Sequence, residues 1–221
     1  VTGVQTCALR SKLEIANAYS NLGIIYHNRG ELSKALEYHK RALALNENMG
    51  QKEGVASAYS NLGSIYQTRG NLEKAAEYQQ KALAVDEKDG MASAYGNLGN
   101  VFFIRGKLDK AVEYYQKALA LDESLGHEEG MANAYSNLGI VYFKRGELSK
   151  ALDYHKKALA LNESLGRKQG VVDAYTRLGN IYQQQGQKEE AKLAYERVVD
   201  YYHEIGNPNM GNKVKVWLNA L

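Results

Sequence analysis

A Leu-Gly dipeptide flanked by aromatic residues recurs five times along the chain, and its regular spacing constrains the fold more than any other feature. The spacings between successive dipeptides are 40, 36, 40 and 40 residues. One aromatic residue lies three positions before each leucine and another lies three positions after each glycine, as Tyr135 and Tyr142 do around Leu138-Gly139. Self-similarity at a fixed period of about 20–50 residues is typical of a solenoid built from one repeated unit.

Apolar residues recur at steps of three or four within each repeat, which places them on one face of two successive helices. In the fourth repeat, Leu138 and Tyr142 belong to the first helix, and Ala151 and Ala158 belong to the second. Gly146 separates the two helices, and a glycine ends a helix at low cost by adopting a positive φ. The sequence therefore predicts an all-α fold made of antiparallel helix hairpins.

The glycine of each Leu-Gly dipeptide lies in the middle of the first helix, where glycine costs about 1 kcal/mol relative to alanine. Because all five repeats have this glycine, we expect a steric reason, namely a close approach of two helix backbones. The small alanine of the second helix, Ala151 in the fourth repeat, is the expected facing residue. A Gly139→Leu substitution is then predicted to disrupt the hairpin by overpacking.

The pattern aromatic-x-x-Leu-Gly-x-x-Tyr, followed by two alanines on the second helix, resembles the tetratricopeptide repeat. The resemblance covers residues 16 to about 211, in five matches that keep register. It implies a right-handed superhelical solenoid of antiparallel helix hairpins. The unit is mostly 40 residues long, whereas the family's basic unit has about 34. The longer unit is similar to repeats in kinesin light chains, Pins-type polarity adaptors and bacterial signalling proteins.

Three regions are expected along the chain: a non-native leader at residues 1–10, five tandem repeats at residues 11–211 and a C-terminal capping helix at residues 212–221. The leader resembles the translation of a sequencing adapter and is interpreted as a cloning or assembly artefact, with a native disordered leader as the alternative. The chain is then expected to be a fragment of a longer protein. Val214, Trp217, Leu218 and Leu221 are predicted to share the side of the capping helix that covers the last repeat.

The second repeat is four residues shorter than the others between Ala82 and Tyr95. Four residues make about one helical turn, so the packing phase is roughly preserved. We expect a tighter junction there and a local change in superhelical pitch. An assembly error in the sequence is the alternative.

Composition and motifs argue against an enzyme, a nucleic-acid-binding protein and a membrane protein. The 28 basic and 25 acidic residues give a formal charge of +3, which is too small to imply nucleic acid or acidic lipid. No uncharged apolar run approaches the roughly 18 residues of a membrane span. The one cysteine, Cys7, lies in the leader, and the histidines show no metal-ligand spacing. We expect a non-enzymatic, cytoplasmic protein without a metal or another cofactor.

Each second helix has a basic residue at the same position. These residues would suggest a phosphate-binding track if they formed no ion pairs with acidic residues. They are Arg41, Lys81, Lys117, Lys157 and Arg197. An acidic residue lies four positions before each of the first four: Glu37, Glu77, Glu113 and Asp153. Such i,i+4 pairs indicate a solvated face whose charges pair with one another.

A row of asparagines directly before the Leu-Gly leucines is the strongest candidate binding feature. It consists of Asn21, Asn61, Asn97 and Asn137, with Arg177 at the same place in the fifth repeat. Asparagine is a poor mid-helix residue, and its amide has both a donor and an acceptor for a peptide backbone. The resemblance to kinesin light chain and Pins-like arrays implies that these side chains clamp an extended peptide in a concave groove. The alternative is that they are surface residues or bond locally.

The same resemblance places further side chains in the groove: Ser20, Ser60, Ser64, Asn100, Phe103, Ser136, Ile140, Phe143, Asn180 and Gln183. Phe103 and Phe143 either form an apolar pocket there or pack against neighbouring helices. Asn100, Asn137 and Arg177 also match three places of the family's clamp for chaperone C-termini. Gly96 and Asp173 stand where that clamp has lysines, which argues against chaperone-tail binding.

The sequence as a whole predicts a protein-interaction module or scaffold that binds an extended peptide or a partner helix in its concave groove. One alternative is the regulatory or sensor region of a larger signalling enzyme. The other is a structural scaffold that assembles with itself through its exposed ends.

Overall fold

The computed structural model describes residues 2–85, 88–204 and 206–218, and of residues 2–9, 88, 89, 208 and 217 it describes the backbone alone. Within this part of the chain every regular element is an α-helix. The helices are α1 (Thr2–Asn28), α2 (Leu32–Met49), α3 (Lys52–Thr68), α4 (Leu72–Val85), α5 (Lys88–Ile104), α6 (Leu108–Leu125), α7 (Glu128–Lys144), α8 (Leu148–Ser164), α9 (Lys168–Gln184), α10 (Lys188–Glu204) and α11 (Pro208–Leu218). The predicted fold class, an all-α solenoid of helix hairpins, is confirmed.

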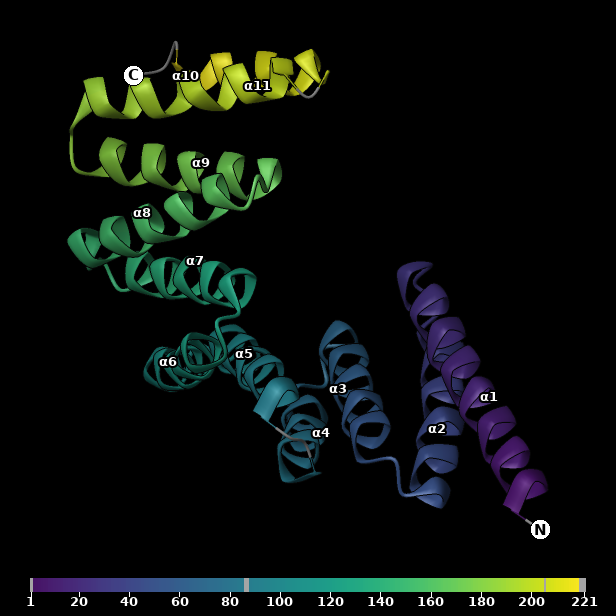
Figure 1. The fold of residues 1–221 in the computed structure, drawn as a ribbon. Coiled ribbons are helices and arrows are strands. Elements are labelled where there is room, and N and C mark those ends of the chain that lie inside the picture. Colours follow the sequence, from purple (N-terminus) through teal and green to yellow (C-terminus); the bar gives the residue numbers. More distant parts are fainter. Residues whose placement is uncertain (1, 86–87, 205, 219–221) are drawn as a thin grey trace. The chain divides into compact units, whose positions relative to one another are not determined.

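The chain divides into two compact units, residues 1–121 and residues 122–221, and the division falls within α6. In the first unit each of the helices α1 to α5 packs on the next, and α3 also contacts both α1 and α5. In the second unit α7, α8, α9, α10 and α11 pack on one another in chain order (Figure 1). Within each unit, neighbours in sequence are therefore neighbours in space, and in the first unit the first helices α1, α3 and α5 also lie side by side.

The turn inside each hairpin depends on a glycine, as the turn between α7 and α8 shows. Gly146 has a φ of 76°, a conformation that side chains with a Cβ rarely adopt. Its N–H donates to the carbonyl of Phe143 at 2.9 Å, and the N–H of Glu147 donates to the carbonyl of Tyr142 at 2.9 Å. These two bonds form a Schellman motif, which satisfies the last carbonyls of α7. The predicted role of this glycine as a helix stop is confirmed.

Each of the first four hairpins contains three stacked aromatic rings, shown here for α7 and α8. The ring of Tyr154 lies parallel to that of Tyr142, with centroids 5.3 Å apart, and is tilted against Tyr135 at 6.1 Å. The ammonium groups of Lys150 and Lys157 lie over Tyr142 and Tyr154 at 5.2 and 5.4 Å. Stacked rings and cation–π contacts each add a modest stabilisation beyond buried area. The aromatic residues around Leu-Gly thus join the two helices of one hairpin.

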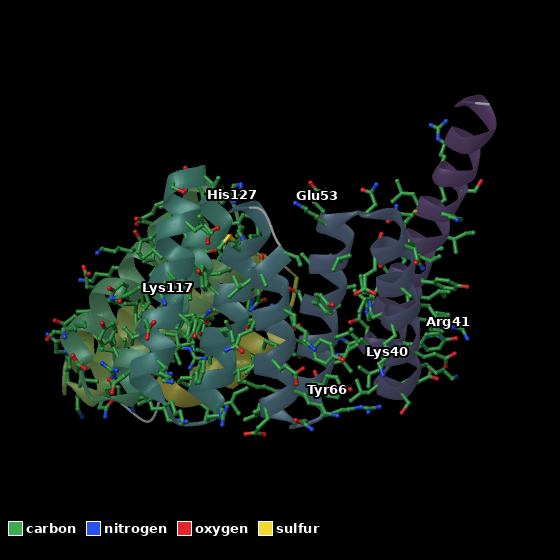
Figure 2. All side chains as sticks on the ribbon, turned by 90° about the horizontal axis from the view of Figure 1, so that it is seen from below. Lys40, Arg41, Glu53, Tyr66, Lys117 and His127 are labelled. Carbon is green, nitrogen blue, oxygen red and sulfur yellow. The ribbon has the colours of Figure 1, made fainter. Side chains whose placement is uncertain are left out.

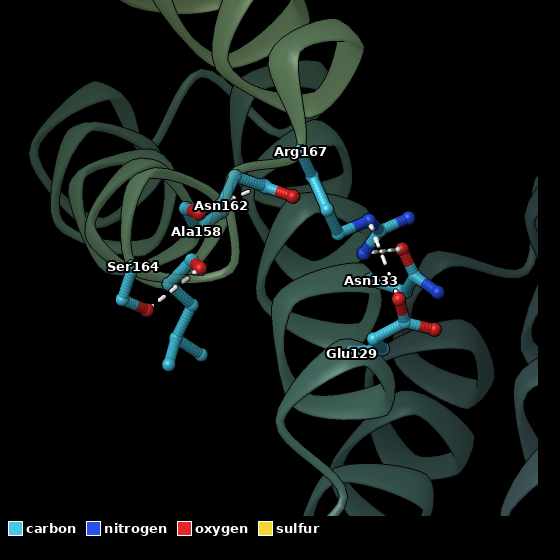
Figure 3. A network of polar contacts seen from close by, with 7 residues as sticks. Glu129, Asn133, Ala158, Asn162, Ser164 and Arg167 are labelled. Carbon is cyan, nitrogen blue, oxygen red and sulfur yellow. Dashed lines mark hydrogen bonds and ion pairs between the residues drawn. The ribbon is translucent and has the colours of Figure 1, made fainter.

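Polar contacts join one repeat to the next. The Tyr135 hydroxyl donates to Glu123 at 3.2 Å and connects α7 to the preceding helix. Arg167, at the N-terminal end of α9, donates through Nη1 to Asn133 of α7 at 3.3 Å, and its Nε lies 4.0 Å from Glu129 (Figure 3). These contacts join the start of α9 to α7, so the two helices are neighbours in the second unit.

The four-residue shortening of the second repeat lies between the start of α4 and the start of α5. These starts, at Leu72 and Lys88, are 16 residues apart, whereas those of α2 and α3, at Leu32 and Lys52, are 20 apart. The difference is about one helical turn. Residues 86–87, which join α4 to α5, lie outside the described residues. A change in superhelical pitch at this junction stays a prediction.

The C-terminal helix α11 packs on α10 and begins at Pro208, whereas the sequence predicted a capping helix at residues 212–221. Val214 is 3% exposed and belongs to a cluster with Val198 and Tyr195, against which Leu218 also packs. A proline is readily accommodated in the first turn of a helix, because its missing N–H would have no intrahelical partner there. The predicted contacts of the Trp217 side chain and of Leu221 lie outside the described residues.

The first helix begins at Thr2, so its backbone is helical through the segment expected to be a leader. The side chains of residues 1–9 lie outside the described residues. The interpretation of residues 1–10 as a non-native leader stays a prediction.

Candidate functional site

The glycine in the middle of each first helix makes room for a large side chain of the second helix. A Cβ added to Gly139 would lie 2.6 Å from Nε2 of His155, and one added to Gly179 would lie 2.5 Å from Cε1 of Tyr195. The nearest atoms to Gly139 thus belong to His155 and not to Ala151, the expected facing residue, whereas the carbonyl oxygen of the equivalent Ala75 lies 3.2 Å from a Cβ added to Gly63. The five pairs are Gly23 with His39, Gly63 with Gln79, Gly99 with Tyr115, Gly139 with His155 and Gly179 with Tyr195. We call each of these second-helix side chains the slot residue of its hairpin.

The slot residues differ in whether their polar atoms are satisfied. The Tyr195 hydroxyl donates to Oδ1 of Asn180 at 2.8 Å, and the Tyr115 hydroxyl donates to Oδ1 of Asn100 at 2.7 Å. Two predicted groove residues, Asn100 and Asn180, therefore use their acceptor inside their own hairpins. In the fourth repeat, Ile140 occupies the position of these asparagines and offers no acceptor.

His155 is consequently left without polar contacts to protein. It is 1% exposed, and both of its ring nitrogens lack a hydrogen-bond partner among the described residues. Burial, together with the nearby positive charge of Arg177, lowers its pKa to about 4. His39 of the first repeat is equally buried, and burial also lowers its pKa to about 4. Both rings are neutral at pH 7, with one N–H donor and one acceptor nitrogen each.

A small pocket opens beside His155 in the second unit. Its lining residues are Ile140 and Phe143 of α7, His155 of α8, and Arg177, Asn180 and Ile181 of α9. The free volume is about 20 Å³, which is room for about one water molecule. The structure thus brings together three of the predicted site residues, Phe143, Arg177 and Asn180. Phe103 lies in the first unit, where it is half-buried.

The asparagine row has side chains that make no hydrogen bond within the described part of the chain. Asn61, Asn97 and Asn137 are half-buried, whereas Asn21 and Arg177 are exposed. None of these asparagine amides bonds to another described residue, so each keeps its donor and its acceptor. Asn137 does not line the pocket of the second unit.

Two serines of the predicted groove are already engaged. The Ser64 hydroxyl donates to the carbonyl of Ser60 at 3.1 Å, and the Ser60 hydroxyl donates to the slot residue Gln79 at 3.2 Å. The Gln79 amide in turn donates to the Ser60 carbonyl at 3.0 Å. The second hairpin therefore satisfies its slot residue with serines, as the third and fifth do with asparagines.

The basic row of the second helices forms the predicted acid–base pairs. Lys81, Lys117 and Lys157 lie 2.7, 2.6 and 3.0 Å from Glu77, Glu113 and Asp153 respectively, and Arg41 pairs with Glu37. Figure 2 shows Arg41 and Lys117 among the side chains that project from the ribbon. Exposed pairs of this kind each contribute about 0–1 kcal/mol. This face is solvated and self-paired, as predicted.

The described residues offer little for other classes of site. In them, no three histidine, cysteine, aspartate or glutamate side chains come together in a way that would hold a metal ion. None of the described helices combines the length and the apolarity that a membrane span requires.

The slot residues are the feature that sequence reasoning missed, although a signal for them exists. Each lies sixteen residues after its glycine. The residue fifteen positions before it is an asparagine, Asn100 or Asn180, where the slot residue is a tyrosine, and an isoleucine where it is a histidine. Gln79 departs from this pattern, because its partner Ser60 lies nineteen positions before it. Comparing the repeats column by column would have revealed the Tyr–Asn pairs.

Comparisons with known proteins agree with this architecture. The sequence model of the family described as "Tetratricopeptide repeat" matches residues 14–88, 90–164 and 130–204. Among solved structures, BtubC (BKLC) from P. vanneervenii is similar with a TM-score of 0.79 and 23% identity, covering 92% of each chain. PilF of Pseudomonas aeruginosa has a TM-score of 0.71 and 20% identity, covering 95% of this chain and 93% of that one.

A third similar structure is MamA, with a TM-score of 0.62 and 25% identity, covering 83% of this chain and 96% of that one. A search of curated protein sequences found no match. At these identities, the likeness to BtubC and PilF concerns the fold alone.

Proposed function

Since the chain belongs to the tetratricopeptide repeat family, whose solenoids present extended binding surfaces, we propose that it binds an extended peptide segment of a partner protein. The binding surface consists of the exposed sides of the first helices. Each unit has its own part of this surface, with Asn61 and Asn97 in the first unit and Asn137 and Arg177 in the second. The chain acts as a non-catalytic interaction module, and it needs no cofactor.

The observation that carries this proposal is the state of the asparagine amides. Asn61, Asn97 and Asn137 recur at one position of successive repeats, are half-buried, and make no hydrogen bond within the described residues. A half-buried side chain has already lost part of its rotamer freedom, so fixing it on a ligand costs less. An amide that donates and accepts can bond to the backbone of a peptide whatever side chains the peptide has.

Replacing Asn61, Asn97 and Asn137 together with alanine tests the proposal. The probe is a displayed library of random twelve-residue peptides, from which the wild-type protein selects binders. We expect the triple variant to bind the selected peptides at least tenfold more weakly in fluorescence polarisation. The melting temperature should change little, because no described hydrogen bond is removed.

The matched control replaces three exposed asparagines, Asn28, Asn48 and Asn212, with alanine. This variant should bind the selected peptides like the wild type. Equal binding by the two triple variants would show that the asparagine row takes no part.

Self-assembly through the N-terminal end is a second candidate function, because α1 has an apolar face that equivalent helices bury. Ile25 is 46% exposed. The residues at the same position of the later repeats, Ile65, Val101, Val141 and Ile181, are each at most 1% exposed. If a second copy covers this face, the mass from light scattering should rise with protein concentration, and Ile25→Gln should abolish the rise. A constant mass would exclude this candidate. The regulatory region of a signalling enzyme stays an untested alternative.

A further inference from the structure

We propose that an acidic side chain, aspartate or glutamate, of the bound peptide docks at the pocket between α7, α8 and α9 and inserts one carboxylate oxygen into its space for about one water molecule. This inference rests on the proposed peptide-binding function and assigns a chemical preference to one place on the surface. It depends on three lining residues that together present donors: Arg177, His155 and Asn180.

The charge at the pocket comes from Arg177. This position is an asparagine in the other four repeats, so the fifth repeat alone adds a cation there. Its guanidinium is exposed and forms no ion pair within the described residues. By contrast, Arg105 pairs with Glu73 at 3.0 Å. An anionic ligand would therefore meet a charge that no described carboxylate already neutralises, and guanidinium–carboxylate bonds are among the stronger hydrogen bonds in proteins.

The other two polar groups also have donors to offer. The Oδ1 atom of Asn180 accepts the hydroxyl of Tyr195 at 2.8 Å, which leaves the amide Nδ2 as the free end of this side chain. His155 is almost fully buried, lines the pocket, and has no protein partner for either nitrogen among the described residues. An ionised carboxylate only accepts hydrogen bonds, so it complements a site whose free groups are mainly donors. A ligand bond to His155 would also remove the cost of leaving a buried polar group unsatisfied.

The balance of charges favours a carboxylate over a phosphate. A phosphoryl group carries about −1.5 to −2 charges and is normally bound by several cations. Arg177 is the one cation among the pocket's lining residues, since His155 is neutral at pH 7. The remaining walls, Ile140, Phe143 and Ile181, are apolar and suit the methylene groups of an acidic side chain. A lysine or arginine side chain in the same place would be repelled by Arg177.

The test uses the random twelve-residue library described above, followed by synthetic peptides with acetylated and amidated ends. We expect the peptides that the wild-type protein selects to share an aspartate or glutamate at one position. Changing that residue to the corresponding amide should weaken binding at least tenfold. Arg177→Asn, which restores the residue of the other repeats, should bring the acid-to-amide ratio of dissociation constants close to one.

Two further variants separate the pocket from general charge effects. Arg197→Asn removes one positive charge from α10 of the same unit and should keep the wild-type ratio. His155→Phe retains a ring in the slot but removes both nitrogens, and it should reduce the ratio several-fold. Thermal melting followed by circular dichroism identifies any variant that fails to fold. If His155→Phe fails to fold, His155→Gln replaces it, because glutamine is the slot residue of the second hairpin.

Several outcomes would overturn the assignment. The first is that the selected peptides share no acidic residue. The second is that Arg177→Asn leaves the acid-to-amide ratio of dissociation constants unchanged, or that Arg197→Asn lowers it equally. The third is that a peptide with phosphoserine in place of the acidic residue binds more tightly than the acidic peptide. A requirement for a free C-terminal carboxylate would also overturn it, because the amidated peptides would then not bind. If the wild-type protein selects no peptide at all, the peptide-binding function fails, and the acidic pocket fails with it. Selection without an acidic preference would leave that function intact.

Discussion

The fourth and fifth hairpins, α7–α8 and α9–α10, use the same steric device but differ in polarity. In both, a mid-helix glycine lies against the ring of a slot residue, at a distance too short for any Cβ. In the fifth hairpin, Tyr195 donates to Asn180, and in the fourth, His155 has Ile140 in that place and finds no described partner.

This difference shows that shape and polarity are set by separate residues. The glycine leaves room for a large, flat side chain, whereas in these two hairpins the residue fifteen positions before the slot residue decides whether its polar atoms are satisfied. Leaving a buried polar group unpaired costs about 1–3 kcal/mol. The fourth hairpin accepts that cost beside the pocket to which Arg177 contributes its charge. Such departures from local consistency are expected at functional sites.

Filling the slot should have the largest effect and should be equally severe in both hairpins. Gly139→Leu and Gly179→Leu each force a branched side chain into a ring that already lies within about 2.5–2.6 Å of the glycine's Cβ position. We expect each to reduce the free energy of unfolding by roughly 3 kcal/mol or more in urea denaturation.

Gly96→Ala is the control for the slot variants. Gly96 is also within a first helix, but a Cβ there meets nothing within 4 Å. This variant should gain about 0.5–1 kcal/mol from helix propensity. If Gly139→Leu is tolerated as well as Gly96→Ala, the slot has no steric role.

Acid should destabilise the fourth hairpin and leave the slot residue of the fifth unaffected. The pKa of His155 is about 4 in the folded protein and about 6.5 when unfolded. The unfolded state therefore binds more protons between these values, and stability falls as the pH is lowered from about 6.5 to about 4. The full contribution is about 3 kcal/mol, on the order of 1.4 kcal/mol for each pKa unit.

Urea denaturation at pH 7, 6, 5 and 4 measures this effect. The free energy of unfolding should decrease less with falling pH in the His155→Gln variant than in the wild type. His39 contributes in the same direction in both proteins, so some decline should remain. Burial raises the pKa of Tyr195, which keeps it neutral throughout this range. Identical pH dependence of the wild type and His155→Gln would contradict the prediction.

Removing the hydroxyl of the fifth slot residue should have a smaller effect. Tyr195→Phe leaves Oδ1 of Asn180 without its 2.8 Å donor and should cost about 1–1.5 kcal/mol of unfolding free energy. Tyr182→Phe is the control, because the Tyr182 hydroxyl has no hydrogen bond within the described residues, and it should change stability by less than about 0.5 kcal/mol. Equal effects of the two variants would show that the hydroxyl bond is not what distinguishes this hairpin.

The smallest effect is expected from converting the fourth hairpin to the chemistry of the fifth. Ile140→Asn and His155→Tyr should each destabilise alone, since each leaves a polar group without its partner. The double variant should recover about 0.5–1.5 kcal/mol relative to the sum of the single effects. A double-mutant cycle by thermal denaturation measures this coupling, and a coupling of zero would mean that the Tyr–Asn pair cannot be transferred between hairpins.

Most of the fold could be predicted from the sequence because the repeat shows the same pattern five times. The positions of the hairpin turns, the acid–base pairs of the second helices and the capping of the last repeat by Val214 all follow from periodicity. The predicted start of the last helix is four residues later than its observed start at Pro208, because the first turn combines proline and glycine, which in a sequence are typical of turns.

The candidate site was only partly predictable, and the slot residues explain why. Periodicity places residues on a face of one helix, but it does not show how two helices are rotated against each other. Ala151 was therefore expected where His155 lies. Asn180 lines the pocket, yet its bond to Tyr195, which decides which end of its amide remains free, required the structure. Phe143, Arg177 and Asn180 come together around one buried histidine only because α7, α8 and α9 pack on one another, and the sequence pattern does not show this packing.

The short separation between a slot residue and its partner, fifteen residues for Tyr115 and Tyr195 and nineteen for Gln79, also bears on how such an array can grow. Both partners lie within one hairpin, so duplication of a single forty-residue unit copies a complete, matched pair. The first and fourth hairpins share the His–Ile combination, and the third and fifth share Tyr–Asn. Each unit is thus a heritable block that can be inserted or lost without creating mismatched interiors in its neighbours. Selection is then free to alter exposed positions such as that of Arg177 one repeat at a time.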